Sequence, residues 1–141
     1  MAGAGLNILP PDKFDGDSDF DRFTKLLTAY MGCQDSDYVQ LMGQAHRAAG
    51  PITQEALDAL DQAMIDGGRD QGQFALLNTR LYYVLISLTD KAASTIVDNA
   101  QNSNGIEAWR RLCERYSRTN QHKSIMSFVA IMSMNYQMIK H

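Results

Sequence analysis

The stretch covering residues 74–88 constrains the fold more than any other part of this sequence. Its apolar residues recur at intervals of three or four, as on one face of an α-helix. These are Phe74, Leu77, Leu81, Leu85 and Leu88. Residues 81–88 are also rich in strand-forming side chains, but no partner strand is visible elsewhere in the sequence. Because apolar residues also occur off the main stripe, we expect a central helix that is buried on most sides.

Six other segments show helical periodicity, and most are bounded by residues that start or stop helices. The expected N-terminal caps are Ser18, Ser36, Thr53 and Thr89-Asp90. The expected stops are Gly32, Gly50-Pro51 and Gly67-Gly68. The sixth helix carries Ile106 to Tyr116, and a seventh begins at Gln121. The sequence therefore predicts an all-α, compact multi-helix bundle of about six to seven helices.

Composition divides the chain into three parts. Residues 1–17 are rich in glycine, proline and aspartate, which predicts an extended N-terminal segment. Residues 18–118 hold six of the helices and form one predicted lobe. Residues 119–141 are expected to be a linker and a helix leading towards a second lobe. The methionines of this last part either fill a core or form an adaptable binding surface, and the sequence leaves both open.

Length and cysteine content indicate a soluble, cytoplasmic protein. A chain of 141 residues can bury roughly 68% of its unfolded surface, so it needs no disulfide or metal to fold. Cys33 and Cys113 are far apart in sequence and belong to no metal-binding motif, which favours a reducing compartment. We find neither a secretory signal nor an apolar stretch of about 18 residues, so we expect no membrane association.

Charge is distributed unevenly along the chain. From Gly105 to His141 there are six Lys or Arg and two Glu, a net charge of +4. Subtraction from the totals of 13 and 16 leaves seven bases and 14 acids before Gly105, a net charge of −7. Such asymmetry favours either head-to-tail contacts between copies or a nucleic-acid-facing end.

No recognisable catalytic motif is present. The histidines His46, His122 and His141 lie outside any serine, cysteine or zinc protease signature, and there is no phosphate-binding or dinucleotide-binding glycine motif. The alternating aspartates Asp15 to Asp21 faintly resemble a calcium loop, but the required glycine and glutamate are misplaced. We therefore predict that the chain is not an enzyme and holds no cofactor.

A basic cluster marks the sixth helix and the residues after it. Arginines flank the apolar stripe of Trp109, Leu112 and Tyr116, and clustered guanidinium groups attract phosphates. The alternative is a solvated face on which Glu107 pairs with Arg111 and Glu114 pairs with Arg118. The candidate RNA or inter-subunit contacts are Arg110, Arg111, Arg115, Arg118 and Lys123.

Three motifs occur in an order typical of one known family. Residues 105–116, with Trp109, Leu112 and Tyr116, resemble the Trp-x-x-Leu-x-x-x-Tyr helix of Gag capsid domains in LTR retrotransposons. Residues 81–93 are similar to the leucine-rich helix and small residues that precede it, and Phe14-Asp15-Gly16 with two later phenylalanines is similar to the family's opening. The last helix, from Ser124, is similar to the entry to the second capsid lobe.

The resemblance implies a structural function. A Gag capsid domain, here its N-terminal lobe and the start of the second, self-associates into a shell that packages the element's RNA. It would act in the cytoplasm and within virus-like particles, with itself as partner and RNA bound mainly by regions outside this chain. The alternative is a helical adaptor, or a domesticated Gag-like module, that binds a protein or nucleic acid.

Seven apolar residues are expected to anchor the core of the lobe. The expected anchors are Phe20, Phe23, Leu81, Leu85, Trp109, Leu112 and Tyr116. We expect Trp109 to be mostly buried against the helix of residues 74–88.

Overall fold

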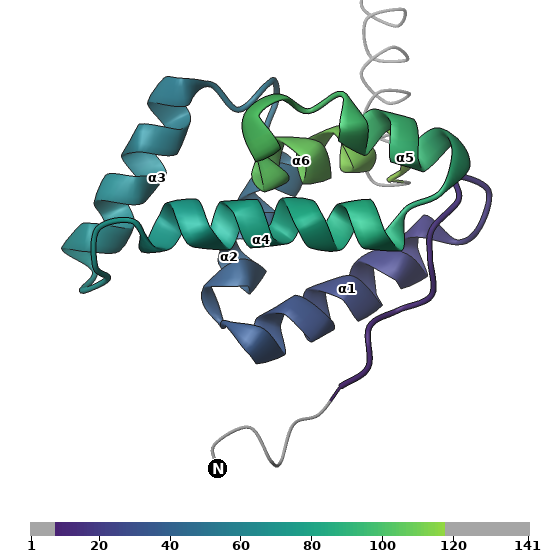
Figure 1. The fold of residues 1–141 in the computed structure, drawn as a ribbon, viewed down its shortest axis with the longest axis horizontal. Helices are drawn as coiled ribbons and strands as arrows, with labels where there is room; N and C mark the ends of the chain where they lie inside the picture. Colours follow the sequence, from purple (N-terminus) through teal and green to yellow (C-terminus); the bar gives the residue numbers. More distant parts are fainter. Residues whose placement is uncertain (1–7, 118–141) are drawn as a thin grey trace, which may run out of the picture.

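The structure, a computed structural model, describes residues 8–117. Six α-helices and one 3-10 turn occupy this range, and none of its residues belongs to a named strand, so the all-α prediction is confirmed (Figure 1). The elements are α1 (Phe20–Gln34), α2 (Asp37–Arg47), α3 (Gln54–Asp66), α4 (Gln73–Leu88), α5 (Lys91–Asp98), the 3-10 turn Gln101–Ser103 and α6 (Gly105–Tyr116). The predicted seventh helix and the boundary to a second lobe lie outside the described residues.

α1 begins one residue later than we expected. The side chain of Asp19, not Ser18, caps the helix by accepting a hydrogen bond from the amide of Arg22. Ser18 is already engaged, because its amide and hydroxyl both donate to Asp15 in the preceding turn. Gly32 does not end the helix either, since α1 continues to Gln34.

Of the N-terminal caps predicted for the next two helices, the one for α2 is wrong and the one for α3 is confirmed. Ser36 precedes α2 but makes no capping hydrogen bond, while Asp35 accepts from the amide of Asp37. Thr53 caps α3 as predicted, with its hydroxyl accepting from the amide of Ala56. α3 ends at Asp66, and Gly67 is its C-cap, also as predicted.

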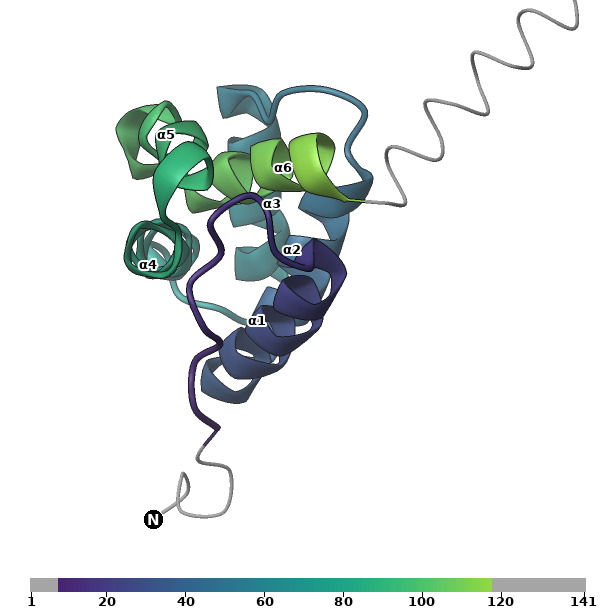
Figure 2. The same ribbon diagram turned by 90° about the vertical axis from the view of Figure 1, so that its right-hand side faces the viewer.

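The N-terminal segment closes one end of the helical bundle. Its residues 8–17 form no helix, in keeping with the extended segment expected there. Phe14 exchanges backbone hydrogen bonds with Leu88 and Asp90 at the end of α4. Its ring packs on Phe23 and edge-on to Tyr116, with centroids 5.3 and 4.9 Å apart. The segment therefore ties α4 to the start of α1 and the end of α6 (Figure 2).

α6 lies at the centre of the packing, against α2, α4 and α5. Gly105 allows the close approach to α4, because a Cβ at this position would clash with the backbone of Asn78 and Tyr82. The side chain of Asn78, buried in α4, secures the same junction by accepting a hydrogen bond from the amide of Ile106 at 2.8 Å. Asn104 caps α6 by accepting from the amide of Glu107.

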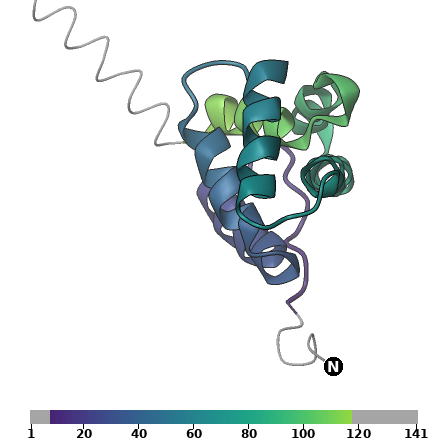
Figure 3. The ribbon, with the colours of Figure 1, turned by 90° about the vertical axis from the view of Figure 1, so that its left-hand side faces the viewer.

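α3 is the least embedded helix. It stands at the left-hand side of the molecule in Figure 1, and from that side it lies in front of α2 and α4, packing against α4 (Figure 3). None of its residues is fully buried, and Leu57, Leu60 and Met64 are only partly buried against the core. The whole described chain thus consists of a tightly packed group of helices with one loosely attached helix at its side.

Candidate interaction surfaces

Six of the seven expected core anchors are buried. Phe20, Phe23, Leu81, Leu85, Trp109 and Leu112 are each at most 5% exposed, and Tyr116 is partly buried.

Trp109 is buried, as expected, with 1% of its surface exposed. Its indole nitrogen donates to the carbonyl oxygen of Met42 in α2 at 3.2 Å. Its ring stacks on Phe20 of α1, with centroids 5.6 Å apart. These two partners lie in α2 and α1, and α6 also packs against α4, where Gly105, one turn before Trp109, makes the close approach. The expected packing of the indole itself against α4 stays a prediction.

The first arginine of the basic cluster belongs to the interior. Arg110 is 5% exposed, and it donates two hydrogen bonds to Glu107, at 2.7 and 2.9 Å. Glu114 receives a further hydrogen bond from the same guanidinium. The prediction that Arg110 contacts RNA or another subunit was therefore wrong, because the packing of α6 buries this side chain and pairs it with the buried Glu107 and the exposed Glu114.

Glu107 is the acceptor on which this network converges. It receives hydrogen bonds from Arg110, from Arg111 at 2.7 Å and from the amide of Ile52 at 2.8 Å. Burial by itself raises the pKa of Glu107, but the hydrogen bonds from Arg110, the Ile52 amide and Arg111 outweigh it and lower the pKa to about 2. The buried carboxylate thus stays ionised and joins α6 to the segment before α3.

The remaining basic candidates are divided between two environments. Arg111 pairs with Glu107, which confirms the predicted helical pair, and it also donates to the carbonyl oxygen of Asn99. Arg115 is exposed, and its guanidinium lies 5.4 Å from the centre of the Tyr116 ring. Arg118 and Lys123 lie outside the described residues. Within residues 8–117, the cluster therefore presents far less available positive charge than its sequence indicates.

The outer face of α4 is an apolar surface that the sequence analysis missed. Leu76, Tyr83 and Ile86 are 51%, 59% and 39% exposed. They recur along one side of the helix. Leu76 and Tyr83 border a shallow hollow of about 410 Å³ that also includes Arg80 and Val84. The prediction that α4 is buried on most sides was wrong, because no other described element covers this side. The residues of this exposed surface are the apolar residues off the main stripe of the helix, which the sequence analysis interpreted as buried.

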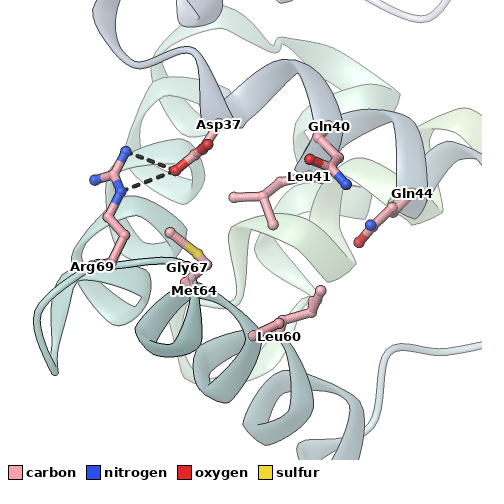
Figure 4. A pocket seen from close by; sticks show the side chains of 9 residues that line it. Asp37, Gln40, Leu41, Gln44, Leu60, Met64, Gly67 and Arg69 are labelled. Atoms are coloured by element: carbon pink, nitrogen blue, oxygen red, sulfur yellow. Dashed lines mark hydrogen bonds and ion pairs between the residues drawn. The ribbon is translucent and has the colours of Figure 1, made fainter.

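A second candidate surface is the groove between α2 and α3, called here the α2–α3 groove (Figure 4). It has a volume of about 280 Å³. Its apolar floor is formed by Leu41, Leu60, Ala63 and Met64, and its polar rim by Asp37, Gln40, Gln44 and Arg69. This groove could not be predicted from the sequence, because it depends on how far α3 stands from α2.

Arg69 holds one end of the α2–α3 groove. Its guanidinium forms ion pairs with Asp35 and Asp37, which connects the loop after α3 to the start of α2. The hydrogen bond from Arg69 lowers the pKa of Asp35. These ion pairs fix the Asp37 end of the groove.

Within residues 8–117, no three His, Cys, Asp or Glu side chains are arranged so that they could hold a metal ion. None of the helices in this range has both the length and the apolar character needed to cross a membrane. No protein-family model, no curated protein and no solved structure matches this chain.

Proposed function

We propose that this chain is a structural domain that associates with copies of itself, as the capsid region of a retrotransposon Gag polyprotein does in forming a shell around RNA. The observation that carries the proposal is the apolar outer face of α4. Leu76, Tyr83 and Ile86 form one exposed stripe on a helix that is otherwise held in the core. A second copy with the same stripe would remove both surfaces from water.

The stripe supports only a weak contact. Full burial of a large apolar side chain contributes about 1.5–3 kcal/mol, so three half-exposed side chains contribute on the order of 3 kcal/mol per copy. Roughly 4 kcal/mol of net binding free energy corresponds to a millimolar dissociation constant, and association also loses translational and rotational freedom. Stable assembly would therefore need several contacts per copy, as in a shell, rather than one isolated dimer.

Contact with RNA is the less supported part of the proposal. Arg110 is buried and Arg111 is paired with Glu107. Among the basic candidates of the described range, Arg115 alone is exposed. RNA binding would therefore depend mainly on residues after 117, including Arg118 and Lys123, and on regions outside this chain.

The test is light scattering and electron microscopy of concentrated protein in low salt and in concentrated phosphate. Phosphate is excluded from protein surfaces and strengthens apolar burial, so we expect assembly to persist or increase there. Replacing both Leu76 and Tyr83 with lysine should abolish this assembly. The matched control places lysine at Ala59 and Gln62, two exposed positions on α3, and should assemble like the wild type.

Three results would argue against this proposal. A wild-type chain that stays monomeric in every condition contradicts self-association and favours the adaptor function. A double variant of α4 that assembles normally contradicts the role of the stripe. Equal loss of assembly in the double variants of α4 and α3 would show that added charge, and not the α4 surface, prevents assembly.

A further inference from the structure

The outer face of α4 and the α2–α3 groove are separate apolar surfaces of one lobe. The residues that border the hollow on α4 and the residues that line the groove have no member in common. In Figure 3, α2 lies behind α3 to its left, and α4, seen end-on, lies to its right. One copy of the chain can therefore engage both surfaces at once, each with a different neighbour.

The two surfaces have complementary shapes. α4 presents a helix from which Tyr83 projects, with 59% of its surface exposed. The groove is concave, with Gln40 and Gln44 on one wall and Leu60 and Met64 on the opposite wall (Figure 4). Aromatic side chains that fill pockets are common anchors of protein interfaces. Because a glutamine amide can donate to a hydroxyl and accept from it, the groove suits both the ring and the hydroxyl of Tyr83.

Charge favours contact between the two surfaces. Arg80 is exposed in the middle of the α4 stripe and is the only charged residue of that helix. The groove has the opposite sign. Its lining residues, their neighbours in the chain and the ion-pair partner of Arg69 include five acids and one base, a net charge of −4. These residues are Asp35, Asp37, Asp61, Asp66, Asp70 and Arg69.

The same arginine disfavours contact between two α4 stripes. A contact between identical faces has two-fold symmetry. An axis through the stripe would bring Arg80 of both copies together, because this residue lies between Leu76 and Tyr83. Like charges held together in an interface reduce the affinity. Charge therefore selects the partner surface, while the apolar side chains supply most of the attraction.

We propose that the outer face of α4 docks in the α2–α3 groove of a second copy, with Tyr83 in the groove and Arg80 towards its acids. This inference rests on the proposed self-association and names the surface that receives the stripe. Because the two copies use different faces, each keeps one further stripe or groove for another neighbour. Such a contact repeats from copy to copy, and it closes into rings or continues as an open array.

The experiment uses two variants of the full chain, each with one surface blocked. Leu76→Lys combined with Tyr83→Lys blocks the stripe, and Ala63→Arg blocks the groove from an exposed position on α3. At millimolar concentration, where the wild type associates, each variant alone should give amide NMR shifts that do not change with dilution. Mixed together, the two should form a dimer that grows no further, because the mixture joins one intact stripe to one intact groove.

Isotope labelling of one component shows which faces meet. When the stripe variant is labelled, adding the unlabelled groove variant should shift amides of α2 and α3 until the shifts saturate. When the groove variant is labelled instead, the shifts should appear in α4. Melting curves from circular dichroism check that both variants are folded.

Arg80→Ala provides a second test that leaves both apolar surfaces intact. In an otherwise wild-type chain it should weaken association several-fold, because the attraction to the acids of the groove is lost. Contact between two stripes predicts the opposite result, since the repulsion between two arginines is removed.

Ala59→Arg is the matched control, because Ala59 is also exposed on α3 but does not line the groove. It should associate like the wild type. Equal loss of association in Ala59→Arg and Ala63→Arg would attribute the effect to added charge and overturn the proposal.

The proposal is also overturned if the mixed variants show no shifts, or if Arg80→Ala strengthens association. Association that survives in Ala63→Arg but not in the stripe variant would mean that the groove does not receive the stripe. That result would leave the proposed function standing. A wild type that stays monomeric at every concentration would instead remove the proposed function, and this inference with it.

Discussion

Replacing Glu107 with glutamine tests whether the buried ion-pair network stabilises the lobe. The side chain of Glu107 is 6% exposed and accepts from Arg110, Arg111 and the amide of Ile52. Its pKa falls from the model-compound value of 4.5 to about 2. A lowering of that size corresponds to about 3 kcal/mol of folding free energy at pH 7. Removing one partner of a buried ion pair costs about 3–5 kcal/mol, which agrees with this magnitude.

The lowered pKa of Glu107 also sets how the stability of the lobe depends on pH. Because the folded-state pKa lies below the unfolded one, the unfolded chain binds the proton more readily as the pH falls. The contribution of Glu107 is therefore complete above about pH 5.5 and is lost between 4.5 and about 2. At pH 3, about 1.4 kcal/mol of it should remain. The difference in stability between the wild type and Glu107→Gln should shrink accordingly.

Urea unfolding at pH 7 and pH 3, followed by circular dichroism, measures this difference. Glu114→Gln is the matched control, because Glu114 also pairs with Arg110 but its side chain is 66% exposed. Exposed pairs contribute about 0–1 kcal/mol, so this variant should stay close to the wild type. Equal losses in the two variants would refute the argument. So would a Glu107→Gln deficit that is the same at pH 3 as at pH 7.

Three other predictions follow from the packing of α6 and from the two cysteines. Trp109→Ala should lower the unfolding free energy by about 3–5 kcal/mol, since the indole is buried, and an unchanged melting temperature would contradict its burial. Gly105→Ala should lower the unfolding free energy by about 1–3 kcal/mol or more, because the new Cβ meets the backbone of α4. An unchanged unfolding free energy would show that α4 and α6 can separate freely. In the native protein, a thiol reagent at pH 8 should modify the exposed Cys33 and spare Cys113, because burial shields the Cys113 thiol and raises its pKa. In urea, both cysteines should react. Rapid modification of Cys113 in the native protein would contradict its burial.

The helices themselves could be predicted from the sequence because their signals are local. Thr53 and Gly67 bound α3 as expected, since a capping hydroxyl and a glycine act within their own turn. The start of α1 was misplaced by one residue because Ser18 and Asp19 are neighbouring residues that can both cap a helix, and Ser18 is already bonded to Asp15. Periodicity identifies the helix, but the choice between neighbouring caps depends on the preceding turn.

The surfaces could not be predicted, because they depend on which helices meet. Apolar residues on two sides of α4 are compatible with full burial or with an exposed stripe, and only the position of the neighbouring helices separates the two. Arg110 shows the same ambiguity for charge. In sequence it belongs to a basic cluster, and in the structure it is buried and paired with the buried Glu107 and the exposed Glu114. The sequence analysis considered helical ion pairs for Arg111 and Arg118 but none for Arg110. The ion pair between Arg110 and Glu107 depends on the burial of that face of α6.

This pairing changes where the positive charge of the chain is available. Residues 105–117 hold three arginines and two glutamates, a net charge of only +1. Two of these arginines, Arg110 and Arg111, are engaged with Glu107. The larger basic excess, +3 without any acid, lies in residues 118–141. An electrostatic contact made by this chain, with another copy or with RNA, would therefore draw mainly on residues after Ser117.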